Sequence, residues 1–193
     1  MTVTLLSQRL ARIHEGLREA ARRRLKSFGA SDRNFQLEPV ANENDLLAFE
    51  QFCGVKLPVE YREFIKTLGD GGAGPGYGLL PLVEGLEYDK EPKTPEILRS
   101  PFEFEKYNDA AHLLNPENDS YPPRTGSSTL STEGCYYRHF IVISGPTYGQ
   151  MWIDQTTSDG GYFPLNVDFL TWYERWLEDV LAGRNGIWWH QDR

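Results

Sequence analysis

Residues 57–82, LPVEYREFIKTLGDGGAGPGYGLLPL, decide the fold of this chain. Pro58 suits the first turn of a helix, because its φ is fixed and it lacks an N–H that would go unbonded there. Apolar side chains then recur at helical spacing, at Tyr61, Phe64, Ile65 and Leu68. Gly69 can adopt positive φ and end this helix, and residues 79–82 predict a strand after the glycine-rich turn. The stretch therefore predicts an amphipathic helix that turns sharply onto a strand, with the other elements packed around that pair.

Two more helices are predicted upstream. Asn42 is a good N-cap for a helix that Gly54 can stop. With a link of only a few residues, this helix is expected to pack against the Pro58 helix as a helical hairpin. Residues 6–28 carry apolar side chains at helical spacing and predict a first helix that Gly29 ends. Residues 31–41 read as an extended connector between the two.

Downstream, the pattern changes to strands. Residues 136–144 contain the apolar run FIVI, which predicts a central strand buried on both faces. Residues 150–154 and 162–165 predict two further strands, with an Asp-Gly turn signal between them. Links this short make the sheet antiparallel. Asn166 is then expected to cap a final helix with a broad apolar face.

Three intervening segments give weaker signals. Residues 83–99 are polar, contain several prolines and read as irregular. Residues 102–107 alternate aromatic and charged side chains, as a strand or a short edge element would. Residues 115–134 have the composition of a loop, and loops this long are usually functional or mobile.

Length and composition indicate one domain with additions and an ample core. The chain has 193 residues, of which 39% are hydrophobic and 13% aromatic. The mean hydropathy of -0.53 argues against a membrane span, and the first residues lack the apolar core of a signal peptide, so a cytoplasmic location is expected. Cys53 and Cys135 form no disulfide framework, and both are expected to be buried thiols.

Charge is unevenly distributed along the chain. A net charge of -8 disfavours nonspecific nucleic-acid binding and allows a basic protein partner. Between Leu5 and Phe28, however, seven basic residues outnumber two acidic ones, and residues 22–24 are three consecutive arginines. This run fits a nucleic-acid or membrane patch, or a solvated helix face whose cations favour the C-terminal end of the helix. We favour the second interpretation, because the acidic remainder of the chain would repel phosphate.

No motif for a cofactor, a metal or catalysis is spelled out. Residues 69–74, GDGGAG, match G-x-G-x-x-G, but that fingerprint needs a strand before it and a helix after it, the reverse of what is predicted here. The segment is better interpreted as a turn with several positive φ angles, or as a place where a partner approaches the backbone. None of the four histidines lies in a metal-binding motif, and we expect His139 to be structural or exposed. No cofactor is expected.

The predicted fold class is α+β. An antiparallel sheet of about four to six strands is expected, with the N-terminal helices and a C-terminal helix packed around it. Residues 1–30 would form a basic amphipathic helix, residues 31–183 the α+β domain and residues 184–193 a tail. In that tail Trp188 and Trp189 fit docking on the domain's own sheet or contact with a partner.

Several short motifs, taken together in their order and spacing, resemble the SUKH superfamily. They are Cys53-Gly54, Leu57-Pro58-x-x-Tyr61-Arg62-x-Phe64, Gly78-Leu79-Leu80-Pro81-Leu82, residues 140–144, residues 151–154 and the aromatic residues of the last helix. The resemblance covers roughly residues 42–181. This group includes fungal cell-wall-synthesis regulators and many bacterial immunity proteins that neutralise polymorphic toxins. The resemblance implies a SUKH-like fold and a binding protein, and it assigns no catalytic residue.

The leading hypothesis is a non-enzymatic immunity protein that blocks a cognate toxin of basic charge, of the nuclease or deaminase type. Acidic residues would steer such a toxin, and tyrosine and tryptophan would anchor it. The candidate contact residues are Asp70, Tyr77, Glu84, Trp152, Asp154, Asp159 and Tyr162. Trp152 fits core packing equally well, and Asp154 also fits a role in stabilising the turn after it.

Two other functions stay open. The fungal relatives suggest a regulatory or scaffold module that binds a cellular protein without neutralising it. An enzyme with an unfamiliar active site is a third hypothesis, which needs perturbed titratable groups that converge in a deep pocket. Direct binding of nucleic acid or membrane is not expected. The oligomeric state, including whether the arginine-rich helix forms a dimer, is left open by the sequence.

Overall fold

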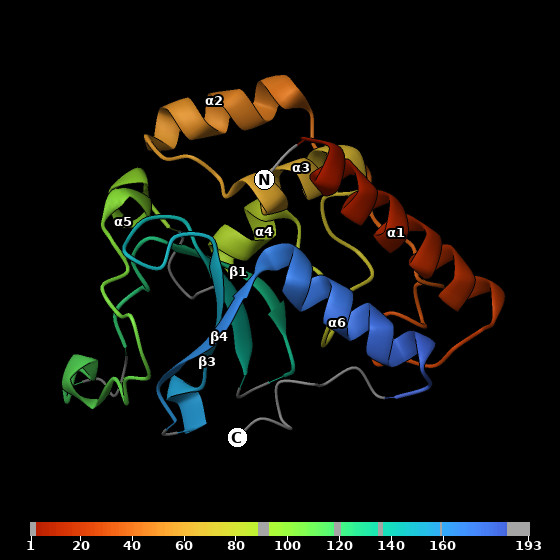
Figure 1. Ribbon diagram of the computed structural model, residues 1–193. Coiled ribbons are helices and arrows are strands. Elements are labelled where there is room, and N and C mark those ends of the chain that lie inside the picture. The colour runs from red at the N-terminus through yellow and green to blue at the C-terminus, as the bar shows by residue number, and fades with distance from the viewer. Residues whose placement is uncertain (1–2, 89–92, 118–120, 135–136, 159, 185–193) are drawn as a thin grey trace.

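The computed structural model describes residues 3–88, 93–117, 121–134, 137–158 and 160–184 (Figure 1). It confirms the α+β class: a four-stranded antiparallel sheet, in the order β1-β2-β3-β4, carries helices on one face. The helices are α1 (Val3–Arg22), α2 (Glu43–Cys53), α3 (Val59–Thr67), α4 (Leu82–Glu87), α5 (Pro95–Arg99) and α6 (Phe169–Leu181), with short 3-10 turns at Ala111–Leu113 and Thr156–Ser158. The strands are β1 (Ser127–Thr132), β2 (Arg138–Val142), β3 (Gln150–Asp154) and β4 (Tyr162–Asp168).

The central strand β2 is buried on both faces, as its apolar run predicts. Phe140 lies opposite Thr129 of β1 and Trp152 of β3. Side chains of β2 alternate between two cores, because successive residues of a strand point to opposite faces. Ile141 joins the large core beneath the helices, and Phe140 joins a smaller aromatic cluster on the other side.

The helical face of the sheet is built around α6. Its buried aromatic side chains meet those of α3, with Phe64 4.8 Å from Tyr173 and 5.1 Å from Phe169 between ring centroids. Helix α1 lies beside α6 along its length (Figure 1), and a Cβ on Gly16 would stand only 2.8 Å from a methyl carbon of Leu177. Nearer the start of both helices, Arg9 of α1 donates a hydrogen bond to the carboxylate of Glu174 in α6. Helix α1 is thus part of the main core.

Residues 102–107, predicted as a strand or edge element, are irregular and cover the second face. The ring of Phe102 lies 5.3 Å from Phe140, 5.0 Å from Trp152 and 5.7 Å from Tyr162. Only Asn108, next in the chain, makes an isolated bridge to β4. The aromatic side chains of this segment therefore pack on the sheet without extending it.

Three predictions about the middle of the chain are wrong. Residues 115–134 are not one loop, because they contain β1, a fully buried strand whose sequence SSTLST lacks an apolar pattern. Residues 83–99 are not irregular throughout, since they contain most of α4 and all of α5. The strand expected at residues 79–82 is also absent: Leu80 N–H bonds the carbonyl of Leu130, and Leu82 already begins α4.

Helix boundaries agree with the sequence at some caps and differ at others. Asn42 accepts a hydrogen bond from the N–H of Asn44, and Gly54 ends α2 in the left-handed conformation. Asp168, not Asn166, caps α6 by accepting from the N–H of Thr171. Gly69 was expected to end α3 with a positive φ, but its φ is not positive. The first glycine after α3 with a positive φ is Gly71.

The predicted helical hairpin is wrong as well. Helix α2 packs against α5, and it is tied to α3 through ion pairs of Arg62 with Glu43 and Glu50. Cys53, at the end of α2, is a buried free thiol as predicted. Cys135, Trp188 and Trp189 lie outside the described residues.

Candidate protein-binding surface

Helix α4 is a short helix held firmly against the sheet edge. The carboxylate of Asp70 accepts a hydrogen bond of 2.9 Å from the N–H of Leu82, in the first turn. Gly85 lies so close to β1 that an added Cβ would stand 2.1 Å from the carbonyl oxygen of Thr129. The glycine-rich loop thus supplies the group that holds α4, and a glycine within α4 permits its close approach.

The outward side of α4 combines apolar and acidic side chains. Leu82 and Leu86 point into the core. Val83 and Tyr88 are 61% and 40% exposed, and the carboxylates of Glu84 and Glu87 are exposed beside them. We call the set formed by Asp70, Val83, Glu84, Glu87 and Tyr88 the α4 surface.

The negative charge of the α4 surface affects proton binding within it. Burial raises the pKa of Asp70, and the nearby charges of Glu38 and Glu84 raise this pKa further, whereas the hydrogen bond from Leu82 N–H opposes both effects. Glu84 on the α4 surface and Glu38 beside it, which is paired with Arg33 at 3.1 Å, therefore both lie close enough to act on Asp70. A basic partner would relieve their repulsion.

Tyr77, predicted to share a contact surface with Asp70 and Glu84, lies apart from them. Its N–H bonds the carbonyl of Thr132 at 2.8 Å. Its ring meets that of Phe28, with centroids 4.5 Å apart. The structure therefore joins Tyr77 to the segment after α1, while Asp70 and Glu84 belong to the α4 surface.

Three of the other predicted contact residues, Trp152, Asp154 and Tyr162, are internal. Trp152 and Tyr162 lie in the aromatic cluster of the second face. Asp154 is buried, where it forms an ion pair with Arg124 and accepts hydrogen bonds from the backbone and hydroxyl of Thr156. Asp154 thus stabilises the turn after β3, the alternative that the sequence left open. Asp159 lies outside the described residues.

Sequence reasoning missed Val83, Glu87 and Tyr88, because their segment was taken as irregular. A signal was present: Pro81 precedes Leu82 and Leu86, which are four residues apart, as on one face of a helix. Phe28 was missed for another reason. It was counted on the apolar face of the first helix, but α1 ends at Arg22.

His139 has a structural role, as predicted. Its side chain is fully buried in β2, where Nδ1 accepts a hydrogen bond from the indole N–H of Trp172 at 3.3 Å. The other nitrogen, Nε2, lies 2.8 Å from a carboxylate oxygen of Glu133. Because Nδ1 accepts, Nε2 carries the proton and donates it to Glu133. The imidazole thereby links β2, α6 and the end of β1.

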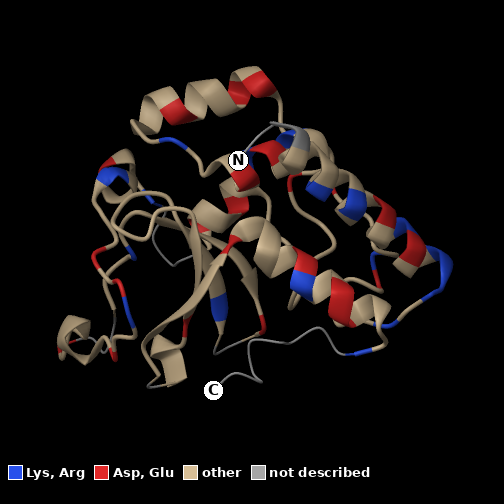
Figure 2. Cartoon of the chain, viewed as in Figure 1, with Lys and Arg blue, Asp and Glu red and all other residues tan. Residues whose placement is uncertain are grey.

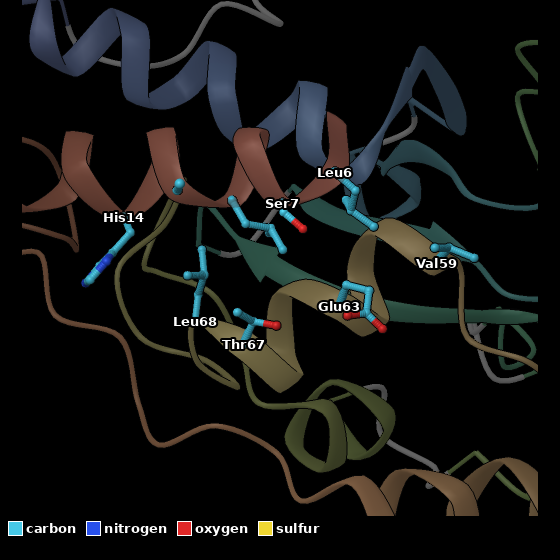
Figure 3. Close-up of a pocket in the computed structure, with 9 residues that line it drawn as sticks. Leu6, Ser7, His14, Val59, Glu63, Thr67 and Leu68 are labelled. Carbon is cyan, nitrogen blue, oxygen red and sulfur yellow. The ribbon is translucent and has the colours of Figure 1, made fainter. Parts of the chain in front are cut away.

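A groove of about 540 Å³ lies between α1 and α3 (Figure 3). Its lining is mostly apolar, with His14 and Glu63 among the polar members (Figure 3). Glu63 forms an ion pair with Lys66 at 2.6 Å.

The described part of the chain holds no group of three or more histidine, cysteine or acidic side chains placed to bind a metal. Within that part, no helix has both the length and the apolar character that crossing a membrane requires.

Comparison with known proteins identifies the family. No curated protein matches the chain significantly. The model of the SMI1 / KNR4 family (SUKH-1) matches residues 40–175. This range includes the whole sheet and the α4 surface, and it leaves out α1 and Phe28. Because the match extends over more than half of its length, the chain belongs to the SMI1 / KNR4 family (SUKH-1).

Proposed function

We propose that this chain is a non-enzymatic protein-binding module that neutralises a cognate bacterial polymorphic toxin by direct contact. The observation that carries the proposal is the α4 surface. Val83 and Tyr88 offer exposed apolar area on a helix fixed to the sheet, and carboxylates surround them. Binding hot spots commonly consist of such anchors within a polar rim.

Charge supports a basic partner. The chain carries a net charge of -8. The pKa of Asp70 is raised first by burial and also by the charges of Glu38 and Glu84, and a cationic side chain of a partner would offset those charges. A toxin that degrades or modifies nucleic acid must itself attract phosphate and is therefore expected to be basic. An acidic inhibitor would meet such a toxin rapidly and could cover the site that holds nucleic acid.

Family membership supports the same function. The SUKH resemblance implies immunity proteins as one large group, and the match includes the α4 surface. The regulatory alternative, suggested by the fungal relatives, would use the same surface for a cellular protein. In the immunity function the partner is toxic when the chain is absent, and in the regulatory function it is not.

The test is co-expression with the toxin encoded beside the gene. We expect the wild-type chain to form a complex with the toxin and to rescue growth. Glu84→Lys and Tyr88→Ala should each weaken binding by about tenfold or more, as loss of a hot-spot contact does. Glu178→Lys, an equal charge change on the exposed side of α6, is the matched control and should bind within about twofold of wild type.

Three outcomes would overturn the proposal. The first is a folded chain with no toxin complex and no rescue. The second is a loss of affinity in Glu178→Lys equal to that in Glu84→Lys, because the α4 surface would then have no special role. The third is a stable complex with a cellular protein and none with the toxin, which would favour a regulatory function.

A further inference from the structure

We propose that a second surface of this chain, formed by Arg24, Lys26, Phe28 and Tyr77, binds an acidic polypeptide segment that carries an aromatic side chain. We call it the basic–aromatic surface. It differs from the α4 surface in charge and in the elements that form it, so it does not depend on the function proposed above. Phe28 lies outside the residues matched by the family model.

The aromatic pair at its centre is exposed yet fixed. Phe28 and Tyr77 are 60% and 51% exposed, with ring centroids 4.5 Å apart at an interplanar angle of 60°. Gly29, at φ 73°, lies against the glycine-rich loop that carries Tyr77. An added Cβ on Gly29 would stand 2.4 Å from the carbonyl oxygen of Gly76. Tyr77 is also held by the carbonyl of Thr132. An aromatic pair placed in advance loses little conformational entropy on binding, which favours its use as an anchor.

The two cations that precede Phe28 in the chain differ from the two arginines just before them. Arg22 is paired with Glu19 at 2.7 Å, and Arg23 donates to the carbonyl of Leu181 at 3.0 Å. Arg24 and Lys26 are exposed, and neither forms an ion pair with any residue that the structure describes. Figure 2 shows Lys and Arg gathered at the C-terminal end of α1 and in the segment that follows it. Two exposed positive charges therefore lie within four residues of Phe28 in the sequence, and one exposed carboxylate, that of Asp32, lies four residues after it.

This combination suits a short acidic segment better than nucleic acid. Two free cations match two carboxylates, and the aromatic pair can pack against one aromatic side chain. A nucleic-acid strand would gain only about two phosphate contacts, which gives weak and salt-sensitive binding.

A long polyanion would also meet the acidic side of the chain. Tyr77 is bonded to Thr132 and Gly85 of α4 lies against Thr129. These positions on β1 are three residues apart, or about 10 Å at the rise of a strand. A nucleic-acid strand leaving the basic–aromatic surface in that direction would therefore approach the carboxylates of the α4 surface, which repel it.

The experiment measures binding of labelled probes to the full chain by fluorescence anisotropy at low salt. The first probe is a peptide of alternating Asp and Trp residues, the second has Asn in place of Asp, and the third is a thymidine oligonucleotide. We expect the acidic peptide to bind at least about tenfold more tightly than either of the others. Absence of binding by the acidic peptide, or tighter binding of the oligonucleotide, would overturn the proposal.

Variants locate the site. The double change Arg24→Glu and Lys26→Glu, and separately Phe28→Ser, should each weaken binding of the acidic peptide by about tenfold. The matched control reverses two exposed arginines elsewhere on α1, Arg12→Glu and Arg18→Glu, and should bind within about twofold of wild type. An equal loss in this control would show that net charge, not this surface, attracts the peptide.

Circular dichroism should show the wild-type spectrum for each variant, since the substituted side chains are exposed. The Glu84→Lys change of the α4 surface should leave peptide affinity within about twofold. The two proposals can therefore fail separately. A chain that binds the acidic peptide but does not neutralise the toxin contradicts only the proposed function. A chain that neutralises the toxin but does not bind the acidic peptide contradicts only the proposal for the basic–aromatic surface.

Discussion

Asp70 connects the stability of the fold to pH. Its pKa is raised, first by burial and then by the charges of Glu38 and Glu84. The folded state therefore holds the Asp70 proton more tightly than the unfolded state does. The contribution of this group to the free energy of unfolding is greatest below the unfolded pKa, and it falls as pH rises through the folded pKa.

Asp70→Asn should remove that fall in stability with rising pH. The amide oxygen can still accept the hydrogen bond from Leu82 N–H, so the free energy of unfolding near neutral pH should equal or exceed that of wild type. Urea unfolding from about pH 3 to about pH 7 measures this. Asp70→Ala is the control and should lose about 1 kcal/mol, because the N–H of Leu82 loses its acceptor. A pH dependence that is unchanged in Asp70→Asn would contradict the assignment.

The buried ion pair of Arg124 and Asp154 should be essential to the second face of the sheet. Arg124 also donates to Thr129 and lies 4.3 Å above the ring of Phe140. Arg124→Met leaves the Asp154 carboxylate buried with the longer contact to Arg138, at 3.5 Å, so we expect a loss of about 2–3 kcal/mol in the free energy of unfolding.

A double-mutant cycle tests that pair. Asp154→Asn alone should also destabilise the chain, but the double variant should lose less than the sum of the single losses. Urea denaturation supplies all four free energies. Strictly additive losses would show that the two side chains do not act together.

Helix α1 should contribute to the main core although it lies outside the family match. Both Ile13 and Leu5 belong to α1, but the side chain of Ile13 is buried in the core and that of Leu5 is exposed. We expect Ile13→Ala to cost about 2–4 kcal/mol in the free energy of unfolding, and Leu5→Ala less than about 0.5 kcal/mol. Thermal and urea unfolding give both values. If Ile13→Ala were as mild as Leu5→Ala, α1 would be an appendage to a domain that is stable without it.

Elements with a regular apolar pattern could be predicted from the sequence. Helix α3 and the strands β2 and β3 appear in the structure close to their expected bounds, and α1 is present but ends at Arg22, six residues before the expected Phe28. Strand β1 could not be found in this way, because its stabilising partners come from distant segments. Lys93 donates to the hydroxyl of Ser127, and the hydroxyl of Ser131 donates to the carbonyl of Pro75.

The candidate surface was predicted in part. Charge and position on the loop were enough to select Asp70 and Glu84, which lie together at α4. The sequence could not show that Trp152 and Tyr162 are covered, because the covering residues belong to an irregular segment whose path depends on tertiary packing. Nor could it show that Tyr77 meets Phe28, since the contact joins positions far apart in the chain.

The overall charge should make recognition fast and dependent on salt. A net charge of -8 would attract the basic partner proposed above from a distance. We expect the association rate, measured by stopped-flow fluorescence, to fall by about tenfold or more between low salt and about 0.5 M salt, while the dissociation rate changes much less. Similar fractional changes in both rates would indicate that short-range contacts, and not long-range attraction, determine the encounter.

The hydrogen bonds from Tyr77 and Leu80 to β1 have a consequence for how the protein can change over time. They occupy the outer edge of this strand at two of its carbonyls, so a partner cannot add a strand of its own there. Specificity on this side of the molecule is therefore determined by side chains, which single substitutions can exchange without altering the backbone. A lineage whose partner changes could adjust its recognition one residue at a time and keep the same fold.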